Sequence, residues 1–246
     1  MNKTKIEWAD YTWNPVTGCL HGCEYCYARR IANRFADKNN LTYVDGVKPS
    51  HLSNVPYPYG FMPTLHQERL NEPARKEKPQ KIFVCSMADL FGDWVPDEWI
   101  QEVFKACKAA PWHKYLFLTK NPKRYAQEDL IRSCLVDQDY YSCSYFGVSV
   151  TNQQMMDEAM DQFSKINIAC PKFISIEPLL NDIQIKDIWK LKWVIIGQQT
   201  GPGAIPPKPE WVQSIIDQCK AAGVPVFVKR PLYERFPIQE WPEGLK

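Results

Sequence analysis

The chain has 246 residues, 45% of them apolar, which is enough to build a sizeable core in one domain. Its 30 basic and 28 acidic residues leave a formal net charge of +2, so charge neither requires nor excludes a nucleic-acid partner. The N-terminal residues lack the apolar segment of a secretion signal, and no apolar stretch approaches the ~18 residues that cross a bilayer. We therefore expect a cytoplasmic protein with no membrane segment.

Short strand candidates alternate with longer amphipathic segments along most of the chain. A first short strand is expected near residues 13–16, leading into a cysteine-rich loop. Six nearly continuous apolar runs follow, which is typical of buried parallel strands. These runs cover residues 81–85, 115–118, 145–150, 173–176, 193–196 and 225–228.

Helices are expected between these strands because apolar side chains recur there at helical spacing. The expected helices cover residues 97–109, 122–134, 152–166 and 210–222. The methionines at 155, 156 and 160 are interpreted as core packing. Repeated β–α order implies a parallel sheet with right-handed crossovers, so we predict an α/β fold of six or seven units, a partial or complete barrel.

Residues 38–80 interrupt this order, because prolines and turn residues are dense there. We expect a single domain over residues 1–246 in which this segment is a loop excursion. Loops of this length are often functional. The segment could cover the mouth of the barrel, or it could be a plain surface insertion.

Three cysteines lie close together near the start of the chain, Cys19, Cys23 and Cys26, in the spacing C-x3-C-x2-C. Their thiolates could hold three irons of a cubic [4Fe-4S] cluster, which usually takes four cysteines. One iron would then be left open to another ligand. An open coordination position distinguishes a reactive metal site from a structural one.

The cysteines could also bind zinc, which stays open, or form disulfides, which is not favoured. Zinc would need a fourth ligand, which would be His21, His51 or His66. A disulfide framework is not favoured, because the nine cysteines are odd in number and the other six are scattered singly, mostly within apolar runs.

The cysteine spacing, with the aromatic Tyr25 before the last cysteine, resembles the signature of the radical S-adenosylmethionine (radical SAM) superfamily. Further blocks resemble a set of largely uncharacterised radical SAM proteins of phages and bacteria. They are EWADYTWNPVTGC (7–19), SMADLF (86–91), LTK (118–120), ISIEP (174–178) and GPGA (201–204). The resemblance covers residues from about 5 to about 230 and implies a radical SAM-type barrel.

The resemblance implies that Cys19, Cys23 and Cys26 bind the cluster and that S-adenosylmethionine chelates the open iron. Reductive cleavage would give methionine and a 5′-deoxyadenosyl radical. Gly18 and Gly22 would let the loop wrap closely, since glycine tolerates unusual backbone angles. Tyr25 would then lie beside the adenine.

Ligands of parallel α/β folds bind at the carboxyl ends of strands, which selects further candidates by position. Ser86 and Asp89 stand where most of the superfamily has a Gly-Gly-Glu-type turn that grips the methionine amino group. Either could replace that turn, or Asp89 could cap a helix. Lys120 could pair with the methionine carboxylate or be an exposed lysine. Glu177 stands at the barrel mouth, where we expect a functional carboxylate.

Later strand ends add polar and basic candidates. Ser149 and Asn152 could bond the ribose, although Asn152 also suits a helix N-cap. Gln198 follows the strand at 193–196 and could contact the adenine. Lys229 and Arg230 follow the last strand and could meet an anionic substrate.

Four residues beside these candidates have two interpretations each. Trp8, Trp13 and Asn14 precede the cysteine loop and either line the site or seal the bottom of the barrel. Cys85 ends a strand and could donate hydrogen to a product radical, although buried packing is the simpler interpretation.

The leading hypothesis is a radical SAM enzyme that uses a [4Fe-4S] cluster, S-adenosylmethionine and a reducing partner such as flavodoxin or ferredoxin. Its substrate is not specified by the sequence, and nucleic-acid or nucleotide modification or repair is the first candidate. Radical modification of a peptide or small metabolite is the alternative. A non-enzymatic zinc or iron–sulfur module that binds DNA is the third.

Overall fold

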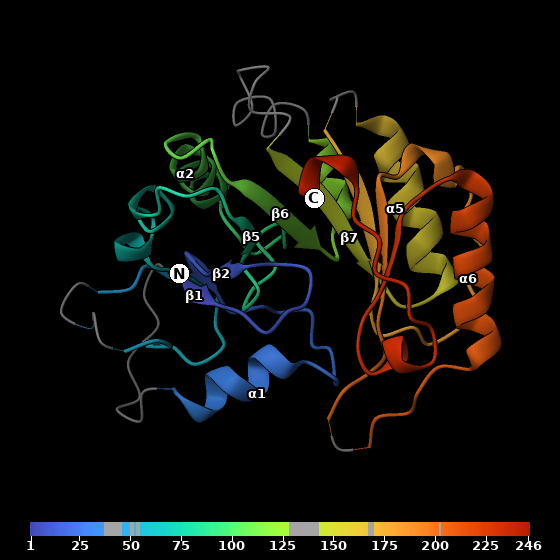
Figure 1. Ribbon diagram of the computed structural model, residues 1–246. Helices are drawn as coiled ribbons and strands as arrows, with labels where there is room; N and C mark the ends of the chain where they lie inside the picture. Colours follow the sequence, from blue (N-terminus) through green and yellow to red (C-terminus); the bar gives the residue numbers. More distant parts are fainter. Residues whose placement is uncertain (37–45, 50–51, 53–54, 128–142, 167–169, 202) are drawn as a thin grey trace.

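The computed structural model describes residues 1–246 except 37–45, 50–51, 53–54, 128–142, 167–169 and 202. Its centre is an eight-stranded sheet in the order β1-β2-β5-β6-β7-β8-β9-β10 (Figure 1). β1 pairs antiparallel with β2, and every other pair in the row is parallel. The strands are β1 (Asn2–Lys3), β2 (Tyr11–Trp13), β5 (Lys81–Val84), β6 (Lys114–Thr119), β7 (Ser144–Val150), β8 (Lys172–Ile176), β9 (Trp193–Ile196) and β10 (Val226–Val228).

The predicted α/β class with a mostly parallel sheet is confirmed, and all six later strands lie where the apolar runs indicated. The first strand is displaced from the expected 13–16 to Tyr11–Trp13. The next segment, β3 (Val16–Thr17), instead pairs antiparallel with β4 (Thr64–Leu65) in a separate two-stranded sheet. Closure of the large sheet into a barrel stays a prediction.

Four α-helices are described: α1 (Tyr27–Arg34), α2 (Asp97–Lys108), α5 (Gln153–Lys165) and α6 (Pro209–Ala222). The last three confirm the helices expected at 97–109, 152–166 and 210–222. In place of the helix expected at 122–134, the structure has a 3-10 helix at Pro122–Ala126 with Gln127 as its C-cap, and residues 128–142 lie outside the described part. α5 and α6 run side by side along one side of the sheet (Figure 1).

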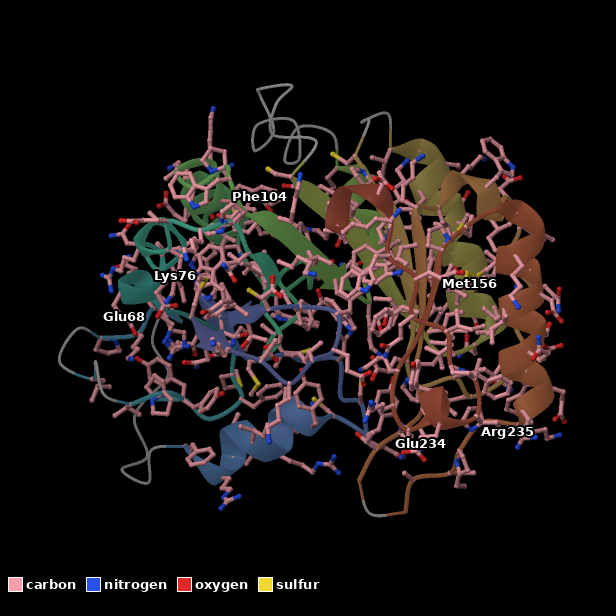
Figure 2. The ribbon with its side chains drawn as sticks, viewed as in Figure 1. Glu68, Lys76, Phe104, Met156, Glu234 and Arg235 are labelled. Atoms are coloured by element: carbon pink, nitrogen blue, oxygen red, sulfur yellow. The ribbon has the colours of Figure 1, made fainter. Side chains whose placement is uncertain are left out.

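The two faces of the sheet carry different cores, because alternate residues of a strand point to opposite faces. One face packs against the helices, and the buried side chains of Phe104 on α2 and Met156 on α5 belong to this core (Figure 2). The opposite face, here called the inner face, forms a second core. Its buried members include Phe83, Leu116, Tyr145, Phe173, Trp193, Ile195 and Phe227.

The inner face is closed at one end by the C-terminal residues. Leu245 belongs to its buried core, and Trp241 packs against Trp193 with ring centroids 5.2 Å apart. The indole of Trp193 donates a hydrogen bond to the carbonyl of Glu240 at 2.8 Å. The carboxyl ends of the strands near residues 119 and 177 border the cavity described below. Within the described part of the chain, no helix has the length and apolar character that spanning a membrane would need.

Candidate functional site

The loop with the three cysteines is held in place by main-chain contacts to two distant segments. The N–H of Gly18 donates to the carbonyl of Met87 at 2.9 Å, and the N–H of Cys19 donates to the carbonyl of Phe61 at 3.2 Å. Gly18 has φ +88°, and a Cβ built on it would lie 2.2 Å from the carbonyl oxygen of Met62. A glycine is required here by both the backbone angle and the close approach.

The three thiols of this loop are free and partly exposed. Cys26 is the N-cap of α1, and its Sγ accepts a hydrogen bond from the N–H of Arg29 at 3.3 Å. The positive end of a helix dipole favours negative charge on such a sulfur. Burial raises the pKa of the Cys19 thiol to about 12, so metal binding at Cys19 would release a proton.

The cysteine loop borders a cavity of about 360 Å³ at the carboxyl ends of the strands. Ten of the predicted site residues line this cavity: Cys19, Cys23, Cys26, Tyr25, Ser86, Asp89, Lys120, Ser149, Glu177 and Gln198. Asn152 is not among the lining residues. Its side chain accepts a hydrogen bond from the N–H of Met155 at 3.0 Å as the N-cap of α5, the alternative that the sequence left open.

Asp89 is buried and its carboxylate is held by four contacts. Its Oδ1 accepts from the Thr119 hydroxyl at 2.6 Å and the Phe91 N–H at 3.1 Å. Its Oδ2 accepts from the Lys120 N–H at 2.8 Å and lies 2.7 Å from His21 Nε2. The carboxylate therefore ties the cysteine loop to the end of β6. A contact between Asp89 and the methionine amino group stays a prediction.

Ser86 lies in a turn that Asn14 fixes. The Asn14 side-chain oxygen accepts from the Ser86 hydroxyl at 3.1 Å and from the Met87 N–H at 2.9 Å. The Tyr27 hydroxyl donates to the Ser86 carbonyl at 2.8 Å, so α1 is also joined to this turn. Asn14 thus fixes the position of Ser86 in the cavity wall through these two hydrogen bonds.

Two lysines of the cavity already have partners in this structure. The ammonium of Lys120 donates to the Tyr25 hydroxyl and lies 4.8 Å from the centre of its ring. Burial raises the pKa of Tyr25, which keeps the phenol protonated. Lys229, after β10, forms an ion pair with Glu177, after β8. The carboxylate crosses over Gly197, where an added Cβ would lie 2.9 Å from Glu177 Cδ.

Trp8 and Cys85 line the cavity, whereas Trp13 does not. Trp8 lines the cavity, whereas Trp13 is fully buried and donates to the carbonyl of Arg69 at 2.8 Å. Cys85 is buried, lines the cavity and has a left-handed backbone, φ +58°. Such an angle is uncommon for a residue other than glycine.

Sequence reasoning did not identify His21, Thr119, Phe61 and Ser175 as parts of the cavity wall. Phe61 comes from the loop excursion, whose described part packs against the cysteine loop. Ser175 could have been found, because it precedes Glu177 by two residues and so shares its face of the sheet. His21 and Thr119 are linked only through Asp89, a long-range contact that no local pattern indicates.

Two of the three histidines considered as a zinc ligand have other partners in this structure. His66 is buried and lies 2.8 Å from the Thr17 hydroxyl, and His21 contacts Asp89. His51 lies outside the described residues. Within those residues, no three Cys, His, Asp or Glu side chains are grouped so that they could hold a single metal ion.

The sequence matches a family model described as "Protein of unknown function (DUF5131)" over residues 3–233. The chain belongs to this family. A search of curated proteins finds no match.

Among solved structures, the family member is similar to spore photoproduct lyase complexed with dinucleoside spore photoproduct. The TM-score is 0.56 at 11% identity, covering 93% of this chain and 79% of that chain. A cysteine-to-alanine mutant of the lyase with the same dinucleoside gives a TM-score of 0.54 at 13% identity, with equal coverage. These likenesses show the fold.

Proposed function

We propose that this protein is a radical SAM enzyme whose Cys19, Cys23 and Cys26 bind a [4Fe-4S] cluster. The observation that carries the proposal is the position of three free thiols on one loop, at a cavity formed by the carboxyl ends of parallel strands. The donor set fits the cluster, because each thiolate of a cubane binds a different iron and the three need not converge on one ion. Spore photoproduct lyase, an enzyme complexed with dinucleoside spore photoproduct, has a similar fold.

When bound, a reduced cluster supplies the electron that cleaves S-adenosylmethionine to methionine and a 5′-deoxyadenosyl radical. The protein's part is to orient and to exclude water. Lys120 would turn from the Tyr25 hydroxyl to the methionine carboxylate, and Tyr25 would contact the adenine. Ser149, Glu177 and Gln198 lie at the ends of later strands, where they would bind the ribose and the adenine.

The substrate class that we favour is nucleic acid or a nucleotide, modified or repaired by hydrogen abstraction. Support comes from Lys229 and Arg230 in the cavity wall, and from the lyase of similar fold, which is complexed with a dinucleoside. A reducing partner such as flavodoxin or ferredoxin would supply electrons, and a cytoplasmic location would keep the thiols reduced. Cys85 is a candidate hydrogen donor to a product radical.

The test is anaerobic reconstitution of the full chain with iron and sulfide. We expect about four irons per chain, broad visible charge-transfer absorbance, and release of 5′-deoxyadenosine when reductant and S-adenosylmethionine are added. The C23A variant should lose the cluster and the cleavage. The matched control C219A removes a thiol that is buried on α6, and it should retain both.

Three results would contradict the proposal. One tightly held zinc without iron would favour the DNA-binding module. A cluster that never cleaves S-adenosylmethionine would argue against an enzyme. An unchanged iron content in C23A would remove the cysteine loop from the site.

A further inference from the structure

Two polar atoms in the wall of the cavity are buried without a partner. They are the indole nitrogen of Trp8, a residue 2% exposed, and the hydroxyl of Ser175, a residue 0% exposed. Three other buried side-chain atoms in the described part of the chain also lack partners, but they belong to residues that do not line the cavity. Two unpartnered polar atoms thus belong to residues of one cavity wall, and both atoms are covered in the absence of ligand.

The two residues lie on the same inner surface of the sheet. The Trp8 ring packs between Phe83 of β5 and Phe173 of β8, with centroids 4.6 and 6.4 Å away. Ser175 follows Phe173 by two residues, so both side chains point to the inner face. Ser149 of β7 is the register partner of Ser175, and it also lines the cavity.

Leaving a buried donor or acceptor unsatisfied costs about 1–3 kcal/mol, so such groups in a native protein call for a partner. An indole N–H can only donate, which means that its partner must be an acceptor. The Ser175 hydroxyl can donate or accept. The apolar wall beside them is formed by Phe83 and Leu118. These surroundings suit a flat ring with acceptors on its edge.

The mouth of the same cavity offers a positive charge. Arg230 follows β10, is exposed, and lines the cavity. The Lys229 ammonium beside it is paired with Glu177, so Arg230 is the cation better placed for a further anion. A guanidinium binds phosphate through two parallel hydrogen bonds.

We propose that Trp8 and Ser175 form the subsite for the base of a substrate nucleotide, with its phosphate toward Arg230. A ring carbonyl of the base accepts a hydrogen bond from the Trp8 indole, and the Ser175 hydroxyl bonds its neighbouring edge. This inference rests on the proposed function and deepens it by naming the residues that bind the base of the substrate. The nucleotide can be free or part of a nucleic acid, since both present the same base and phosphate.

The test measures binding of thymidine 5′-monophosphate to the cluster-reconstituted full chain by calorimetry, with and without S-adenosylmethionine. We expect W8F and S175A each to weaken binding about tenfold, the loss of roughly one buried hydrogen bond. The matched control S144A removes a fully buried serine of β7 outside the cavity, and it should bind like the wild type. Deoxyribose 5-phosphate, which lacks the base, should bind equally weakly to all four proteins.

A second readout separates binding from folding. Because Ser175 Oγ has no internal partner, S175A should unfold within about 2 °C of the wild type in the absence of ligand. W8F loses ring packing against Phe83 and Phe173 but no hydrogen bond, so it should unfold at a moderately lower temperature. W193F loses both ring packing and the hydrogen bond to Glu240, so it should unfold at a lower temperature than W8F. If W8F were destabilised as W193F is, its indole would have an internal partner and the inference would be wrong.

Two further outcomes decide the matter. Equal affinity of wild type, W8F and S175A, or no binding of the nucleotide to the wild type, would overturn the subsite. Tighter binding of an oligothymidylate than of the mononucleotide would support it with nucleic acid as the source, and the reverse would support it with free nucleotide. Release of 5′-deoxyadenosine without nucleotide is assayed separately, so a failure of radical SAM chemistry is distinguishable from a failure of the subsite.

Discussion

Two glycines of the cysteine loop have similar backbone angles but very different surroundings. Gly18 has φ +88° and Gly22 has φ +73°, both in the left-handed region. A Cβ on Gly18 would meet the main chain of Met62 and Pro63, whereas a Cβ on Gly22 would meet no atom within 4 Å. An alanine at Gly22 would therefore meet backbone strain alone, whereas an alanine at Gly18 would meet backbone strain and a steric clash.

We expect G22A to cost about 1–2 kcal/mol, the penalty of a left-handed backbone for alanine. G18A should cost about 1–3 kcal/mol more, because main-chain atoms must move to admit the new methyl group. Urea unfolding measures both changes. Iron content after reconstitution should fall further in G18A than in G22A, and equal losses in the two variants would contradict this account of the loop.

At the scale of residues, local spacing was the informative part of the sequence. It indicated Cys19, Cys23 and Cys26, and position at strand ends indicated several other residues that line the cavity. The contacts of Asp89 with His21 and Thr119 join three segments far apart in the chain, so no local pattern could indicate them.

At the scale of elements, α5 illustrates how a helix start can resemble a ligand site. Asn152 follows β7 directly, and its extended backbone lets its side chain cap the helix. Substituting alanine for a capping asparagine costs about 1 kcal/mol. We expect N152A to lose this much stability while its affinity for S-adenosylmethionine stays that of the wild type.

N152S is the matched control, because serine also caps helices and should restore most of the stability. Chemical denaturation gives the stability, and equilibrium dialysis gives the affinity. A marked loss of affinity for S-adenosylmethionine in both variants would return Asn152 to the ribose site.

The elements themselves were predictable because their patterns are local. Continuous apolar runs gave the six later strands, and helical spacing gave α2, α5 and α6. The short strands β2 and β3 before the cysteine loop could not be predicted in the same way, because two or three residues are too few to show a periodic pattern. Their pairing is decided by partners near residue 64 and residue 82, which only the folded chain brings close.

At the scale of the molecule, one sheet serves stability and function through its two faces. The face covered by helices holds the larger core, and the inner face combines an aromatic core with the cavity. The loop excursion adds a third support, because His66 in that loop donates its main-chain N–H to the Pro15 carbonyl at 2.7 Å. Its side chain contacts Thr17, just before the cysteine loop.

This buried histidine makes stability depend on pH. Burial, together with the nearby charges of Arg69 and Lys48, lowers the pKa of His66 from its usual 6.5 to about 2. Below pH 6.5 the unfolded chain therefore binds a proton at this position that the folded chain does not bind. The contribution of His66 to the free energy of unfolding is therefore fully present above pH 6.5. It is lost as the pH drops below 6.5, by about 1.4 kcal/mol per pH unit for one such histidine.

We expect H66Q to show a shallower fall between pH 6.5 and 5 than the wild type, by close to one proton in the slope. Burial also lowers the pKa of His113, so H66Q/H113Q should be shallower still. Denaturant unfolding at several pH values measures the slopes. If H66Q kept the slope of the wild type, His66 would be charged in the folded protein, and the loop excursion would not hold it in the dry environment that supports the cysteine loop.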